Sequence, residues 1–486
     1  MKHYIKIISL LLSLCMILSS VSLLASCDDQ TVSEGTTNTA ESESESKKDD
    51  IHPEIEKKNY DEEFYLHILP DVNPVGYYWV QESKNDIMSD AIYARQEKVR
   101  QHIGVEIIGT GTGNFSQYIE PFKTAVKNKD GSVDTLISHV YTGIDGLIGE
   151  NYLTDFNDMP GVELDADYWN QRFMEDIALN DHMYLGFSDF NILYTHVITF
   201  NKDILDKYDD ALDESLYDSV TNYRWTLDKM ISLASLAYID NGNDGKTVND
   251  QFGITGYQNI GFAAFLQSSN INLVEQTVKG DYEVAVYNDV NREKTAALVD
   301  KIKGMVNADY SWFWNDGTPT VPMTSNRTLF CITHTYSLPG YIEYDVNFGV
   351  LPYPMWDEAQ KNVGYRSLQW GGYICIPSYL GNAEMVGETI ELLSFYSGDV
   401  TDVFYQKLLG KQVADSPQDK QMLDIVWDSV CSDFGQTYFS VVDDTNLLYL
   451  VTVLTRPNTT ENLASFMAKV DRTSNKLFKQ FLKKTK

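Results

Sequence analysis

The sequence predicts an α/β protein with two lobes, and three observations support this fold class. An apolar leader and a polar tether leave about 425 of the 486 residues for the folded body, which is too much chain for one ordinary core. The body opens with strand, helix and strand patterns, as an α/β lobe does. Its hydrophobic content of 43% and aromatic content of 12% fit a globular protein.

The first 26 residues have the pattern of a secretory signal. Lys2 and Lys6 precede an apolar run over residues 7–24, and small residues follow before Cys27. The segment 24–27 (LASC) resembles the bacterial lipobox, in which the cysteine is lipidated and becomes the first mature residue. The resemblance implies acyl chains such as palmitate on Cys27, which would hold the protein at the outer face of the cell membrane. An ordinary signal peptide with an incidental cysteine is the alternative.

Residues 27–59 are predicted to form a disordered acidic tether. The segment from Asp28 to Asp50 consists mostly of Ser, Thr, Glu, Asp and Lys, and it has too few apolar residues to order itself. The folded body therefore extends over residues 60–486.

The charge balance limits the partners. The 70 acidic and 38 basic residues give a net charge of −32, which argues against nucleic acid or anionic lipid. After the leader and Cys27, three cysteines remain without close spacing, so the sequence predicts neither a metal motif nor a disulfide framework. We expect Cys331, Cys375 and Cys431 to be buried thiols, with one bridge among them left open.

The elements of the body follow in order. A strand at 63–69 precedes a helix at 86–103, whose apolar residues recur at three- and four-residue steps. Gly104 ends this helix, and a strand covers 105–108. The pattern then predicts helices at 118–127, from 168, at 293–307, 383–396, 401–409, 419–430 and 462–482, and strands at 134–141, 192–200 and 328–333.

Tyr141 lies at the carboxyl end of the predicted strand 134–141. Open α/β sheets bind their ligands beyond these strand ends. Tyr141 is therefore the first candidate for a ligand-binding residue.

Four later segments resemble landmarks of one family: 200–205 (FNKDIL), 225–230 (WTLDKM), 348–354 (FGVLPYP) and 370–377 (WGGYICIP). In this order they are similar to the hinge strands, helix start and Pro-rich strand of bacterial extracellular solute-binding proteins of the maltose-binding type. The resemblance extends over most of the mature chain. Thr226 is the expected N-cap of the helix in the second segment.

This resemblance implies a periplasmic-binding-protein-like (type II) fold with hinge strands and a central cleft. Lobe 1 would consist of about 60–195 and part of 375–486, and lobe 2 of about 200–370 and the remainder of 375–486. Such a protein is a monomer without catalytic residues. It closes over a small solute and delivers it to the permease subunits of an ABC importer. Family members most often bind sugars or oligosaccharides, and polyols and peptide-like solutes stay open.

Aromatic residues are the best candidates for contacts with a sugar. The chain has 31 Tyr and 8 Trp, and sugar rings present C–H faces that stack on such side chains. Trp312 and Trp314 lie in a predicted Trp-rich turn at 310–317, Tyr336 follows a strand, and Trp370 precedes two glycines. Core packing explains each of these four equally well.

Two charged residues lie near the same landmarks. Asp189 precedes the predicted strand 192–200, and Arg366 precedes Trp370. Both have groups that hydrogen-bond to hydroxyls. A turn cap for Asp189 and a surface ion pair for Arg366 are the alternatives.

The segment 240–245 (DNGNDG) resembles a calcium loop. Asp240 and Asp244 would supply ligands, but Gly242 and Gln251 stand where such loops carry further oxygen ligands. The sequence therefore favours an Asn/Gly/Asp turn, and we expect no cofactor.

Three other functions remain open. His139, His196 and His334 could meet in space as metal ligands, but no carboxylate or cysteine lies at ligand spacing near them. A surface glycoside hydrolase would need two carboxylates across a sugar, and 70 acidic residues leave that possible. A polysaccharide-binding lipoprotein without a transporter is the third interpretation.

Overall fold

The computed structural model describes residues 52, 54–69, 75–111, 115–140, 143–191, 194–278, 281–314, 320–344, 346–409, 416–456 and 458–485. All of them belong to one compact unit, His52–Lys486. Cys27, most of the predicted tether, and Tyr141 lie outside the described residues.

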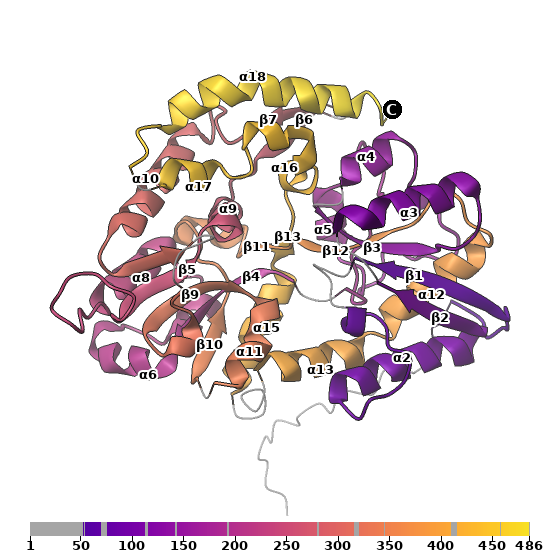
Figure 1. Ribbon diagram of the computed structural model, residues 1–486, viewed down its shortest axis with the longest axis horizontal. Helices are drawn as coiled ribbons and strands as arrows, with labels where there is room; N and C mark the ends of the chain where they lie inside the picture. The colour runs from indigo at the N-terminus through magenta and orange to yellow at the C-terminus, as the bar shows by residue number, and fades with distance from the viewer. Residues whose placement is uncertain are drawn as a thin grey trace, which may run out of the picture. The chain divides into compact units, whose positions relative to one another are not determined.

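The first sheet has four strands in the order β12-β3-β1-β2. β1 (Glu62–Ile68) runs parallel to β2 (Val105–Thr110) and β3 (Thr135–His139), while β12 (Gly371–Cys375) joins β3 antiparallel. Helices α2 and α3 lie on opposite sides of these strands (Figure 1). The predicted strand–helix–strand opening is confirmed.

Local signals set the ends of α2 (Ile87–Ile103). The Asp86 carboxylate accepts hydrogen bonds from the backbone N–H groups of Met88 and Ser89, which caps the first turn. Gly104 ends the helix at φ 68°, in the left-handed region that glycine adopts without strain. The other helices of this half are η1 (Val75–Tyr77), α3 (Phe115–Asn128), α4 (Ile144–Gly149), η3 (Phe156–Asp158) and α5 (Gln171–Asp176).

The second sheet has the order β10-β4-β9-β5-β8. Its strands are β10 (Phe348–Leu351), β4 (His196–Asn201), β9 (Thr328–His334), β5 (Phe252–Tyr257) and β8 (Ser311–Trp314). β5 runs parallel to both β9 and β8, whereas β4 is antiparallel to β9 and β10. The predicted Trp-rich turn is therefore wrong over residues 311–314, which pair along β5 as an edge strand, and its residues 315–317 lie outside the described part of the chain.

Two crossing segments connect the sheets. The chain enters β4 from the first sheet through Thr195, which bridges to Gln369 on the returning segment. That segment contains β11 (Ser367–Leu368), which pairs in parallel with β13 (Val430–Cys431) before the chain reaches β12. The predicted two-lobed α/β architecture is confirmed, with one of the two larger sheets in each lobe and two further two-stranded sheets, β11-β13 and β6-β7.

Helices complete both lobes. Those of the second half are α6 (Lys202–Leu205), η4 (Asp206–Ala211), α7 (Leu216–Thr221), α8 (Leu227–Leu236), α9 (Asn259–Ser268), α10 (Arg292–Asn307), η5 (Met323–Ser325), η6 (Thr335–Ser337), α11 (Leu338–Ile342) and η7 (Glu358–Asn362), beside the hairpin of β6 (Val274–Val278) and β7 (Asp281–Val284). The chain ends with α12 (Ala383–Phe395), α13 (Gly398–Leu409), α15 (Pro417–Asp428), α16 (Phe434–Thr437), η8 (Phe439–Thr445), α17 (Leu450–Thr455) and α18 (Leu463–Leu482).

Several sequence predictions about single residues are confirmed here. Thr226 caps α8 by accepting a hydrogen bond from the backbone N–H of Lys229. Cys331, Cys375 and Cys431 are free and buried.

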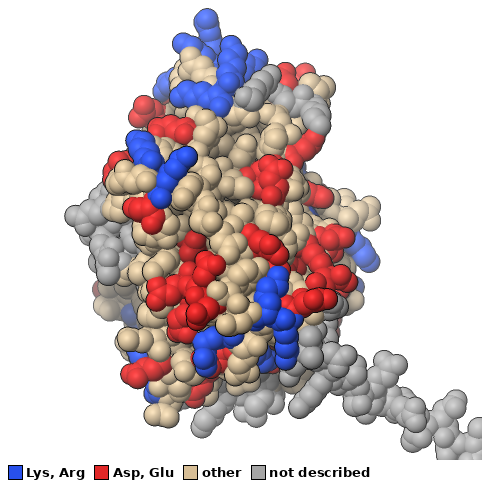
Figure 2. Space-filling model, turned by 90° about the vertical axis from the view of Figure 1, so that its right-hand side faces the viewer, with Lys and Arg blue, Asp and Glu red and all other residues tan. Residues whose placement is uncertain are grey.

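Two further features concern the whole described chain. Its helices include none that combines the length and apolar character of a membrane span. Asp and Glu side chains are spread over the face of the molecule in Figure 2, while Lys and Arg gather at its top.

Candidate functional site

A cavity of about 430 Å³ lies where strands of both sheets end. The carboxyl ends of β5, β8 and β9 meet here because these strands are parallel, and β3 of the first sheet ends here too. This is where open α/β sheets bind ligands. The described lining residues are His139, Tyr194, His196, Tyr257, Gly261, Trp314, Pro322, Cys331, Ile332, Thr333, His334, Ser337, Tyr341 and Trp370. We call this cavity the cleft cavity.

Aromatic rings form much of its wall. Trp370 stacks on His139, with ring centroids 6.1 Å apart and 15° between the planes, and it meets His196 edge to face at 6.4 Å. His334 lies 6.2 Å from His196 and stacks on Tyr336 at 6.1 Å. The wall therefore presents broad ring faces, the surfaces on which the C–H faces of a sugar pack.

The wall carries no formal charge among the residues described. Burial lowers the pKa of His139 and of His196 to about 3, and that of His334 to about 4, so all three imidazoles are neutral at pH 7. The described lining residues include no Asp, Glu, Lys or Arg. An ion placed here would lose its hydration without gaining an opposite charge.

His196 supplies a directed polar group. It is 7% exposed, and its Nδ1 has no hydrogen-bond partner among the described residues. The ring is hydrogen-bonded to the backbone of Leu368, which raises its pKa slightly against the larger effect of burial. Because the carbonyl of Leu368 takes the proton of the other nitrogen, Nδ1 is left as an acceptor.

The structure brings some of the sequence-predicted residues together. Trp314 and Trp370 line the cleft cavity. Tyr336 stacks on His334 at its edge and is 48% exposed. Tyr141 lies outside the described residues, two positions beyond His139.

The other predicted residues lie elsewhere. Trp312 packs at 5.5 Å from Phe252 and is absent from the described lining of the cleft cavity. Asp189 is half-buried and donates its backbone N–H to the carbonyl of Tyr168. Arg366 lines a second cavity, described below.

Sequence reasoning missed most of the polar wall. It considered the three histidines only as metal ligands and did not place them in the sugar site, although each lies at an end of a strand: His139 ends β3, His196 starts β4 and His334 ends β9. That shared position was the available signal. Tyr194, Tyr257 and Tyr341 carried no comparable signal.

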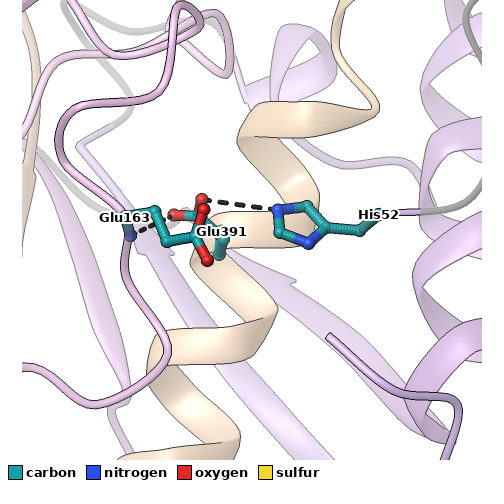
Figure 3. Close-up of side chains that lie close together, drawn as sticks. All are labelled: His52, Glu163 and Glu391. Carbon is teal, nitrogen blue, oxygen red and sulfur yellow. Dashed lines mark hydrogen bonds and ion pairs between the residues drawn. The ribbon is translucent and has the colours of Figure 1, made fainter. Parts of the chain in front are cut away.

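One group of described residues has the spacing of a metal site. The side chains of His52, Glu163 and Glu391 each place a ligand atom within 4.8 Å of the others (Figure 3). However, Nδ1 of His52 accepts hydrogen bonds from the backbone N–H groups of Glu54 and Ile55. Its Nε2 therefore carries the proton and donates it to the hydroxyl oxygen of Tyr168 at 2.9 Å, so it is not a metal ligand.

Glu391 has the surroundings of a buried anion. Its side chain is fully buried and lies 3.5 Å from Nε2 of His52. It accepts hydrogen bonds from the indole N–H of Trp169, the backbone N–H of Glu163 and the hydroxyl of Tyr168. These donors stabilise the carboxylate, and the contact between Glu391 and His52 holds residue 52 against α12.

The calcium-like loop is closed by its own backbone. The Asp240 carboxylate accepts hydrogen bonds from the N–H groups of Gly242, Asp244 and Gly245. This is an Asx-type turn, the arrangement that the sequence favoured.

Comparison with known proteins identifies relatives of the fold. The chain matches a model of the bacterial extracellular solute-binding proteins over residues 93–401. No curated protein matches it. Among solved structures, it resembles the GacH receptor of Streptomyces glaucescens, studied unliganded and with acarbose, with a TM-score of 0.54 and 13% identity over 87% of this chain and 99% of that one.

Two further structures have the same fold. An ABC substrate-binding protein of Listeria monocytogenes in complex with cycloalternan gives a TM-score of 0.53 and 11% identity, over 86% of this chain and 99% of that one. The maltose/maltodextrin-binding domain MalE of Bdellovibrio bacteriovorus, bound to maltotriose, gives 0.52 and 13%, over 86% and 100%. Since the family model matches well over half of the chain, this protein belongs to the bacterial extracellular solute-binding proteins.

Proposed function

We infer that this protein is the receptor of an ABC importer and captures an uncharged carbohydrate in the cleft cavity. The observation that carries the inference is the wall of that cavity, which combines stacked aromatic rings with neutral hydrogen-bonding groups. Three structures of the same fold hold acarbose, cycloalternan or maltotriose, which agrees with a carbohydrate solute.

The groups of the wall have separate tasks. Trp314 and Trp370 supply ring faces for the apolar side of the sugar. Nδ1 of His196 has no hydrogen-bond partner among the described residues, and it accepts a hydrogen bond from a sugar hydroxyl. The hydroxyls of Thr333 and Ser337 donate or accept according to the solute.

Capture proceeds by closure of the two lobes. The cleft cavity has walls from the first sheet at His139 and from the second sheet at Trp314 and His334. A solute that contacts both walls binds the closed form more strongly and shifts the population toward it. The permease then recognises the closed form. No chemical step is needed.

A thermal-shift panel tests the solute class. The panel contains neutral oligosaccharides and, at matched size, uronic-acid and amino-sugar analogues. A neutral ligand at 100 times its Kd should stabilise the protein by about 2.7 kcal/mol, and the charged analogues should give no shift. A charged solute that stabilises the protein while every neutral sugar fails would refute the inference.

The same proposal includes a lipid anchor at Cys27. The support is the lipobox resemblance of residues 24–27 and the acidic segment that follows. In cells, wild-type protein should incorporate labelled palmitate and remain with membranes, and Cys27→Ser should do neither. Membrane retention of the unlabelled variant would contradict the anchor, whatever the panel shows.

A further inference from the structure

A second cavity, of about 530 Å³, lies between segments of both lobes. One wall comes from α5 and the residues after it, including Asp176 and Ala178, and the other from the β6–β7 hairpin. The walls touch directly, because the Tyr282 hydroxyl donates to the carbonyl of Ala178 at 3.0 Å. This cavity shares no described lining residue with the cleft cavity.

Arg366 lines this cavity and has a buried donor, Nε–H, without a partner among the described residues. The residue is only 7% exposed. Its one hydrogen bond to a described side chain runs from Nη2 to Oδ1 of Asn272, at 3.3 Å, and Nε has no partner among the described residues. A buried guanidinium N–H without a partner is costly, so this cavity favours an occupant that offers a hydrogen-bond acceptor.

The same cavity also has a buried hydrogen-bond acceptor without a donor among the described residues. Oδ2 of Asp176 is buried and has no hydrogen-bond donor among the described residues. Burial raises the pKa of the carboxyls of Asp176 and Asp433, and the charge of Arg366 opposes that rise at both. Neither carboxyl forms a salt bridge with Arg366 among the described residues, and all three residues line the cavity.

The chemistry of the occupant follows from these two needs. An anion offers acceptors but no donor to Asp176, and it would meet the carboxylates of Glu175, Asp181 and Glu275 at the same cavity. A cation offers no acceptor to Arg366. A zwitterion meets both needs, but its carboxylate would face the same acidic residues. A hydroxyl meets both without a charge, because it accepts from Arg366 while it donates to Asp176.

We propose that the cavity between α5 and the β6–β7 hairpin is a second binding site, which takes a small uncharged polyol bridging Arg366 and Asp176. The site is independent of the carbohydrate proposed for the cleft. Its occupant touches segments of both lobes, so it biases their closure by linkage.

Ligand-observed NMR titration of the unit His52–Lys486 tests this site. The probes are glycerol, mannitol and myo-inositol, with acetate, ethylammonium and glycine as the anionic, cationic and zwitterionic counterparts. At least one polyol should bind, and Arg366→Gln and Asp176→Asn should each weaken it tenfold or more. Arg100→Gln, which alters a half-exposed ion pair with Glu97, is the matched control and should change the affinity less than twofold.

Three results would overturn the second site. They are the absence of polyol binding, equal affinity in wild type and both cavity variants, and binding of a charged probe in place of the polyols. Asp176→Asn keeps the side-chain shape, and a melting curve for each variant excludes unfolding as the cause. Trp370→Ala separates the two proposals: a polyol signal that this variant abolishes belongs to the cleft and would also overturn the second site.

Discussion

Trp312 and Trp314 lie two residues apart on β8 but have different surroundings. Trp314 lines the cleft cavity, whereas Trp312 packs near Phe252. We expect Trp314→Ala to lower the affinity for the solute tenfold or more, because a stacking face of about 1–3 kcal/mol is lost. Trp312→Ala should lower stability and leave affinity within about twofold. Isothermal titration measures both, and equal losses of affinity would contradict the assignment.

The buried histidines give the stability a dependence on pH. Burial lowers the pKa of His196 to about 3, while an unfolded histidine titrates near 6.5. Between these values the unfolded state binds more protons, so the free energy of unfolding falls as the pH falls. Asp433 opposes this trend, because burial raises its pKa to about 7 and the folded state then holds the extra proton.

A variant isolates the histidine contribution. His196→Gln should lose less stability than wild type between pH 6.5 and pH 4, by about 1.4 kcal/mol per pH unit at most. Urea unfolding at the two pH values measures the difference. Parallel losses in the two proteins would show that His196 is not held neutral.

The residues of the cleft cavity show how much of the site the sequence could predict. Trp314 was named because it lies in the predicted Trp-rich turn, and Trp370 because two glycines follow it. His139, His196 and His334 were named but not placed together in the ligand site, because their contacts connect strands more than 50 residues apart in sequence. A strand end is visible in a sequence, but the identity of the strand beside it is not.

At the scale of elements, β5 packs tightly against α8. A Cβ added at Gly253 would lie 1.8 Å from the carbonyl oxygen of Ala234, so no side chain fits there. Gly253→Ala should destabilise the protein by about 1–3 kcal/mol. Gly304 in α10 has open space around its Cα, and Gly304→Ala should stabilise by about 0.4–1 kcal/mol. Urea unfolding checks the pair, and the same sign for both changes would contradict the packing.

Element boundaries followed local signals wherever those were strong. Asp86 and Gly104 bound α2, and Thr226 begins α8, as the sequence predicted. Residues 311–314 were wrongly predicted to lie in a turn, because β8 forms by pairing with β5, which lies more than 50 residues earlier in the sequence. The predicted strand 192–200 corresponds to β4, which starts at His196. Thr195 belongs to the crossing segment and bridges to Gln369.

At the scale of the whole molecule, solute binding should change the arrangement of the lobes. The cleft cavity and the second cavity both have walls from two lobes, so a bound solute draws those walls together. Small-angle X-ray scattering should show a smaller radius of gyration when the solute is saturating. An unchanged radius at saturation would contradict closure, although binding itself would stand.

The fold and family were predictable from the sequence because their landmarks recur in order along the chain. The lobe boundaries and the anchor at Cys27 stay predictions. The solute class rests on the assembled cleft, which no single segment contains.

The most direct test of the carbohydrate receptor is calorimetric titration of wild type and Trp370→Ala with a neutral oligosaccharide, followed by recovery of the sugar. We predict one binding event in wild type, a loss of affinity of tenfold or more in the variant, and complete recovery of intact sugar. Equal affinity in both proteins would place the solute outside the cleft cavity, and a cleaved sugar would show a glycoside hydrolase instead of a receptor.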